Sequence, residues 1–82
     1  MRILIVEDDK DITEYLEKGL YESGYSSNWV QSAEEAIPAI ETASYDAAII
    51  DLMLPGIDGE ECIRSMRKKD HSLPVLVLSA KQ

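Results

Sequence analysis

The sequence has few of the features that build disulfide-bonded or membrane-spanning proteins. It contains one cysteine, Cys62, which excludes an internal disulfide and fits a reducing cytoplasm. Its longest aliphatic runs are four residues, far short of the roughly 20 apolar residues that cross a bilayer. The first residues become acidic too early for a secretory signal peptide. We therefore expect a cytoplasmic chain that makes no contact with a membrane.

Positive charge is also scarce, since 8 Lys and Arg residues face 16 Asp and Glu residues for a net charge of −8. Nucleic-acid binding needs a basic face, so we expect no direct contact with nucleic acid. Zinc is excluded because the one histidine and the one cysteine make no ligand set. The acidic excess fits a cation site, a basic partner or ordinary solubilising charge. The positions of the acids must decide among these.

Four short segments predict the strands of a parallel sheet, and three of them are aliphatic runs typical of buried strands, the second being a short strand that contains the tryptophan. They are residues 2–6, 25–30, 47–50 and 75–79. Three stretches with helical spacing separate them, and the apolar positions of each predict an inward face. These positions are Ile12, Tyr15, Leu16, Gly19 and Leu20, then Ala33, Ala36, Ile37 and Ile40, then Cys62, Ile63 and Met66. The alternation predicts one doubly wound α/β unit over residues 1–82.

Acidic and hydroxyl side chains follow three of the predicted strands. Glu7 and Asp8 follow the first, Asp51 ends the third and Ser79 ends the fourth. Ligands of open parallel sheets bind beyond the carboxyl ends of the strands, so these groups should converge if the first and third strands are neighbours. Close carboxylates raise one another's pKa unless a cation lies between them. A magnesium site with oxygen ligands fits this set.

Each of these acids also has a simpler interpretation. Asp51 alone would be an ordinary turn-forming residue. The run Glu7-Asp8-Asp9 would offset the dipole of the first helix, and for Asp9 we prefer this interpretation. The only tryptophan, Trp29, is expected to pack near an edge of the sheet, and we assign it no chemistry.

Three segments resemble the receiver domain of bacterial two-component response regulators, especially those that precede winged-helix transcription factors. They are Val6 to Asp9, Tyr45 to Gly59 with its Asp51-Leu52-Met53-Leu54-Pro55-Gly56 core, and Leu78 to Lys81. The middle segment is highly specific, and the resemblance covers the whole chain. It implies a flavodoxin-like parallel sheet with strand order 2-1-3-4, and a signalling module of transcription regulation instead of an enzyme.

The resemblance also implies a role for each site residue. Asp51 would accept a phosphoryl group from the phosphohistidine of a histidine kinase, and Ser79 would contact that group and transmit the signal. Asp8 and Asp51 would bind Mg²⁺, Glu7 would act mainly through a coordinated water, and Met53 would offer its backbone carbonyl. Such chemistry needs an in-line nucleophile and a charge-neutralising cation, and a carboxylate can be that nucleophile.

The chain departs from the family pattern after its fourth strand. A fifth strand, the last two helices and the lysine that pairs with the phosphoryl group are missing; Lys81 follows Ala80 directly and is a different residue. We therefore expect a single truncated receiver over residues 1–82, impaired in phosphotransfer, that self-associates through the exposed fourth strand. The alternatives are a structural, self-assembling fold without phosphotransfer, and a metal-dependent phosphatase, which lacks an acid/base partner here.

Overall fold

The computed structural model describes residues 1–51, 59–69 and 72–78. The elements follow the predicted order, with three helices between four strands. They are β1 (Arg2–Val6), α1 (Lys10–Glu22), β2 (Ser26–Val30), α2 (Ala33–Thr42), β3 (Ala47–Asp51), α3 (Gly59–Lys69) and β4 (Val75–Leu78). No helix among these residues is long and apolar enough to span a membrane.

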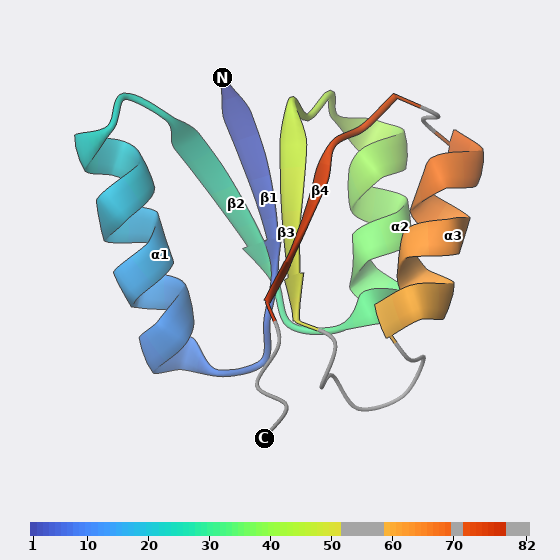
Figure 1. Cartoon of the computed structure of the whole chain (residues 1–82), viewed down its shortest axis with the longest axis horizontal. Helices are drawn as coiled ribbons and strands as arrows, with labels where there is room; N and C mark the ends of the chain where they lie inside the picture. The colour runs from blue at the N-terminus through green and yellow to red at the C-terminus, as the bar shows by residue number, and fades with distance from the viewer. Residues whose placement is uncertain (52–58, 70–71, 79–82) are drawn as a thin grey trace.

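The four strands form one parallel sheet in the order β2-β1-β3-β4, which confirms the predicted topology. β1 and β3 are neighbours, with Val6 beside Ile50 in the register. Both strands are aliphatic on both faces, as expected for strands buried between two layers of helices. All four strands run in the same direction, so their carboxyl ends lie at one edge of the sheet (Figure 1).

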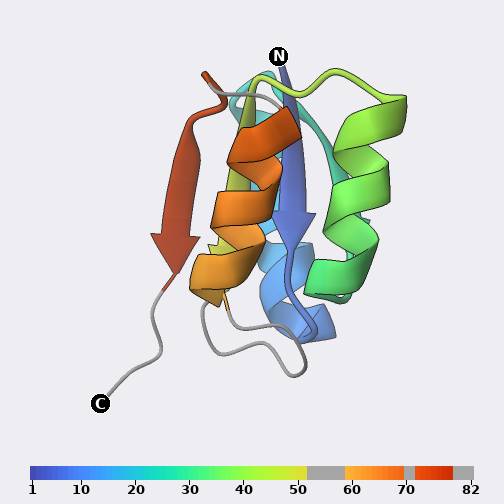
Figure 2. The same cartoon turned by 90° about the vertical axis from the view of Figure 1, so that its right-hand side faces the viewer.

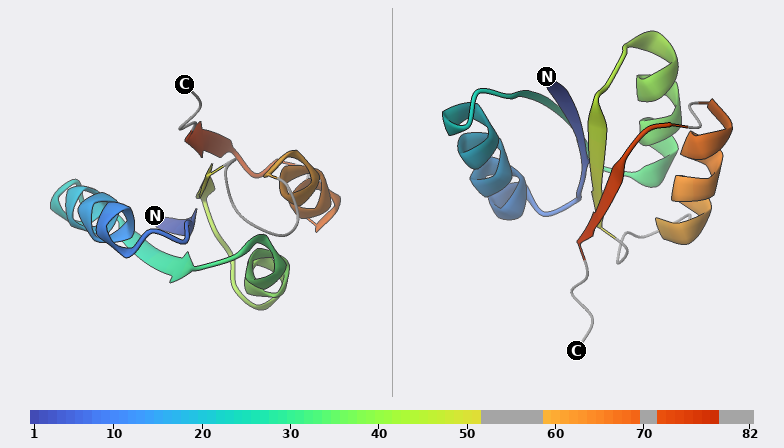
Figure 3. Two further views of the ribbon diagram at one scale, coloured as in Figure 1. Left: turned by 90° about the horizontal axis from the view of Figure 1, so that it is seen from below. Right: turned by 45° about the horizontal axis from the view of Figure 1, so that its top comes forward.

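The helices cover the two faces of the sheet unequally. α1 lies alone on one face, while α2 and α3 pack side by side on the other (Figures 1 and 2). Viewed from the carboxyl ends of the strands, α1 lies beside β2 and β1 and leaves the same side of β4 uncovered (Figure 3). Among the described helices, none therefore covers the α1 side of the sheet at β4.

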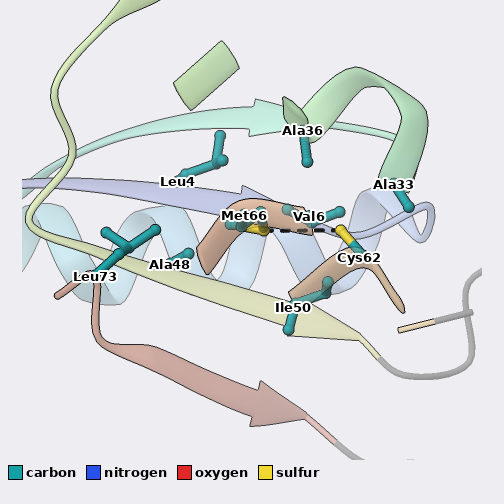
Figure 4. Close-up of a cluster of buried hydrophobic side chains, with 9 residues drawn as sticks. All are labelled: Leu4, Val6, Ala33, Ala36, Ala48, Ile50, Cys62, Met66 and Leu73. Atoms are coloured by element: carbon teal, nitrogen blue, oxygen red, sulfur yellow. Dashed lines mark hydrogen bonds between the residues drawn. The ribbon is translucent and has the colours of Figure 1, made fainter. Parts of the chain in front are cut away.

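The main hydrophobic core lies between the sheet and the α2–α3 layer. Strand residues that point to this side interlock with small and sulfur-containing side chains of the helices (Figure 4). The cluster consists of Leu4, Val6, Ala33, Ala36, Ala48, Ile50, Cys62, Met66 and Leu73. Alternation along the strands sends Ile3, Ile5 and Ile49 to the opposite side, where they are also buried. The inward positions predicted for α2 and α3 are thus confirmed.

The inward face predicted for α1 is correct only in part, because Leu16 and Leu20 are half-buried whereas the other predicted positions are exposed. Ile12 is 42% exposed and Tyr15 is 78% exposed, whereas the fully buried residue of this helix is Thr13. α1 contacts chiefly β2, and no other helix among the described residues packs against its far flank. Apolar periodicity marks every face that is suited to burial, and here only part of that surface has a neighbour to contact.

Candidate metal centre

Three carboxylates meet at the carboxyl edge of the sheet. Oxygen atoms of Glu7, Asp8 and Asp51, one from each, lie within 4.8 Å of one another. Glu7 follows β1 directly and Asp51 ends β3, and the pairing of Val6 with Ile50 places the two residues beside each other. The predicted convergence of acids from two separate strands is therefore present in the fold, and it depends on β1 and β3 being neighbours.

Among the described residues, two acids of the cluster are buried and the third is exposed. Glu7 is 2% exposed and Asp51 is 9% exposed, whereas Asp8 is an exposed residue. Two of the acids are thus removed from water, which normally requires a partner of opposite charge or a proton. Asp8 is therefore the described acid of the cluster that stays in contact with water.

The electrostatics of the cluster appear most clearly in Glu7. Its burial raises the pKa of this carboxyl to about 7, against an ordinary value of 4.5. The negative charge of Asp51 acts in the same direction, and a hydrogen bond from the backbone N–H of Asp9 opposes it. Mutual repulsion of this kind is what a divalent cation relieves, because the cation favours the charged form of each ligand.

The chemistry of the donors fits Mg²⁺. Three carboxylates supply hard oxygen ligands, and Mg²⁺ usually combines one or two such ligands with several waters. Met53 and Ser79, the other two predicted site residues, lie outside the described residues, as do Ala80 and Lys81. The described part of the predicted site is therefore Glu7, Asp8 and Asp51.

Asp9 has the structural role that we preferred for it. Its side-chain Oδ1 accepts hydrogen bonds from the backbone N–H groups of Asp11 (2.9 Å) and Ile12 (3.2 Å) at the first turn of α1. Asp9 is not a member of the three-carboxylate cluster. In the run Glu7-Asp8-Asp9, the first two acids thus line the site and the third caps the helix.

One contact of the site was missed by sequence reasoning. The indole Nε1–H of Trp29, on edge strand β2, donates a hydrogen bond to the backbone carbonyl of Glu7. The predicted position of Trp29 near an edge of the sheet is correct, but its hydrogen bond to the backbone of Glu7 was not predicted. A signal was available in principle, because a half-buried indole N–H needs an acceptor and β2 was expected beside β1.

Comparison with known proteins places this geometry in a family. The model of the response regulator receiver domain matches residues 3–82. The chain is 42% identical over 81 residues to the transcriptional regulatory protein QseB of Escherichia coli O157:H7, covering 99% of this chain and 37% of QseB. It is 46% identical over 81 residues to the transcriptional activator IrlR of Burkholderia pseudomallei, and this match covers 99% of this chain and 35% of IrlR. The chain thus spans about a third of the length of these curated relatives.

Solved structures share the same fold. The response regulator TrrA of Thermotoga maritima, in complex with Mg²⁺ and BeF, is 36% identical with a TM-score of 0.92, and the match covers 99% of this chain and 70% of that one. A complex of the histidine kinase ThkA with TrrA matches with a TM-score of 0.91 at 36% identity, with the same coverage. These matches favour a signalling module over a purely structural fold, and this chain belongs to the response regulator receiver domain family.

Proposed function

We propose that this chain is the phosphoacceptor module of a two-component system, in which Asp51 takes a phosphoryl group from the phosphohistidine of a histidine kinase. The observation that carries the proposal is the meeting of Asp51 with Glu7 and Asp8 within 4.8 Å at the carboxyl edge of a receiver sheet. The relatives support it, because TrrA has been seen with Mg²⁺ and BeF and with the histidine kinase ThkA.

In this proposal a carboxylate oxygen of Asp51 attacks the phosphorus atom in line with the bond to the imidazole nitrogen. A P–O bond forms, the P–N bond breaks, and its electron pair stays on the imidazole. Asp8 and Asp51 would bind Mg²⁺ directly, Glu7 would act mainly through a coordinated water, and Met53 would add its carbonyl. When bound, the cation neutralises charge on the phosphoryl oxygens, while Ser79 would hydrogen-bond the transferred group.

The remaining expectations belong to the same proposal. We infer that the chain is a signalling module whose only chemistry is its own phosphorylation, and that it acts in the cytoplasm, consistent with its lone buried cysteine. Regulation of transcription is proposed for the protein that contains it, in line with the names of QseB and IrlR. Its net charge of −8 supports a receiver that does not itself bind nucleic acid.

The test is incubation with a small phosphodonor and Mg²⁺, followed by intact-mass measurement. We expect the mass of one phosphoryl group to be added to part of the parent chain, in line with the impaired phosphotransfer expected from the sequence, and no addition to Asp51→Asn or when the metal is chelated. Asp11→Asn is the matched control, since Asp11 is exposed on α1 and outside the cluster. Labelling of Asp51→Asn to the same extent as the parent chain would overturn the assignment of the phosphoacceptor.

A further inference from the structure

Trp29 is the only tryptophan of the chain, and it connects an edge strand to the acidic site. It lies on β2 opposite Ile5 of β1, and Ile5 precedes Glu7 by two residues. Its indole N–H donates a hydrogen bond to the backbone carbonyl of Glu7. A large aromatic ring on an edge strand can be explained by packing alone, but packing does not require this donor to point at the loop that bears two acids of the site.

The backbone of Glu7 is held by β2 at both of its polar groups. Its N–H donates to the carbonyl of Val30 at 3.1 Å, and its carbonyl accepts from Trp29. Its side chain accepts a third hydrogen bond, from the N–H of Asp9 at 3.1 Å. Glu7 is therefore clamped between the end of β2 and the start of α1. Because the residue is almost fully buried, water is a poor substitute for any of these partners.

The carbonyl of Glu7 belongs to the peptide group that leads into Asp8. This group is planar, so a hydrogen bond that fixes the direction of its carbonyl also fixes its N–H side and the direction in which the chain leaves toward the Cα of Asp8. Asp8 is the exposed acid of the cluster, and its side chain is not enclosed by the core. The orientation of this peptide consequently contributes to where the Asp8 carboxylate lies relative to Asp51.

We propose that Trp29 is a positioning residue for the metal site, whose indole N–H fixes the Glu7–Asp8 peptide and thereby holds the Asp8 carboxylate beside Asp51. The inference rests on the proposed function in one respect, namely that the three-carboxylate cluster binds Mg²⁺. Trp29 does not touch the metal in this scheme. It acts as a partner behind the ligands, and the loss of such partners commonly weakens metal binding by roughly 10- to 100-fold.

The experiment separates the hydrogen bond from the packing of the ring. Benzothienylalanine at position 29 keeps the shape of the indole and replaces its N–H with sulfur, while Trp29→Phe removes the donor and part of the ring. Mg²⁺ affinity is measured by calorimetric titration, and the amide resonance of Asp8 is followed by NMR in metal-free protein. We expect roughly tenfold weaker Mg²⁺ binding in both variants, with a shifted Asp8 amide before any metal is added.

Ile40→Val is the control for a loss of stability without a change at the site. Ile40 packs against the core from α2, and it lines a small pocket with Tyr45 and Leu73, which precede β3 and β4 at the opposite edge of the sheet. This variant should unfold more easily and bind Mg²⁺ like the parent chain. If the parent chain binds Mg²⁺ and the benzothienylalanine variant binds it equally well, the positioning role is overturned. If the parent chain binds no Mg²⁺, the proposed function fails first and this inference with it.

Discussion

Glu7 is the residue at which burial and charge oppose each other most directly. It is 2% exposed and lies within reach of two further carboxylates, and its pKa is raised to about 7. In the unfolded chain the same carboxyl titrates near its ordinary value of 4.5. Between about pH 4.5 and about pH 7, the Glu7 carboxyl of the folded, metal-free protein therefore keeps a proton that the unfolded chain has lost. Its stability must depend on pH through this group.

The sign follows from the direction of the shift. The contribution of Glu7 to stability is fully present below about pH 4.5 and is lost as the pH rises through about 7. We expect Glu7→Gln to flatten this part of the pH dependence, by on the order of 2 kcal/mol in the free energy of unfolding between about pH 5 and about pH 8. Urea denaturation of the two proteins, at matched pH and without metal, measures the difference.

Mg²⁺ should act against the proton at this residue. A cation favours the charged carboxylate, so added Mg²⁺ is expected to stabilise the parent chain more at about pH 8 than at about pH 6. For the pH dependence of unfolding, Glu22→Gln is the control, because it also removes one carboxylate, but an exposed one at the end of α1. If the free energy of unfolding of Glu7→Gln changes with pH in parallel with that of the parent chain, Glu7 does not carry the dependence.

At the scale of the element, α1 begins at a side-chain cap that also borders the three-carboxylate cluster. Asp9 supplies the cap, and its own backbone N–H donates to the Glu7 carboxylate. Asp9→Ala removes the acceptor for two helix N–H groups and should cost about 1 kcal/mol, whereas Asp9→Asn keeps a capping oxygen and should cost much less. Urea denaturation and amide exchange in the first turn of α1 measure both effects. Equal losses for Ala and Asn would contradict the capping role.

The sequence predicted elements best where one local signal was sufficient. Continuous aliphatic runs identified β1 and β3. At the start of α2, Ser32 Oγ accepts a hydrogen bond from the Glu35 N–H, and a Ser followed three residues later by Glu is a local sequence signal of a helix start. The second strand was predicted one residue too long, since β2 begins at Ser26. The buried side of α1 was predicted only in part, because which flank contacts the sheet depends on the partners of the helix as well as on its own periodicity.

The sequence predicted which acids form the candidate site, but not the hydrogen bonds that hold their backbone. Acids at the ends of two strands indicate convergence, because parallel strands share one carboxyl edge, and Glu7, Asp8 and Asp51 do meet there. Sequence periodicity does not describe hydrogen bonds between strands that are distant in the chain. The bond from Trp29 to the carbonyl of Glu7 joins residues 22 positions apart and depends on the register of β2 against β1.

At the scale of the whole molecule, the described sheet ends at β4. Among the described strands none pairs with the outer edge of β4, and Leu76 and Val77 are 62% and 40% exposed. Leu76 is paired with the buried Ile49, so the two side chains share the face on which α1 lies. An apolar strand with unpaired backbone groups is a template for pairing with another chain.

We therefore propose that the 82-residue polypeptide self-associates through β4. A two-fold dimer would pair the two β4 strands antiparallel and continue the sheet from one copy into the other. Light scattering should show a mass that rises with concentration, and Leu76→Lys should shift the equilibrium to monomer, because a charge on an edge strand opposes strand pairing. Tyr21→Lys is the matched control, since Tyr21 is an exposed apolar residue of α1 away from the sheet edge. A compact monomer at high concentration in the parent chain would refute the pairing, and equal dissociation by both lysine variants would assign the association to general surface hydrophobicity instead of β4.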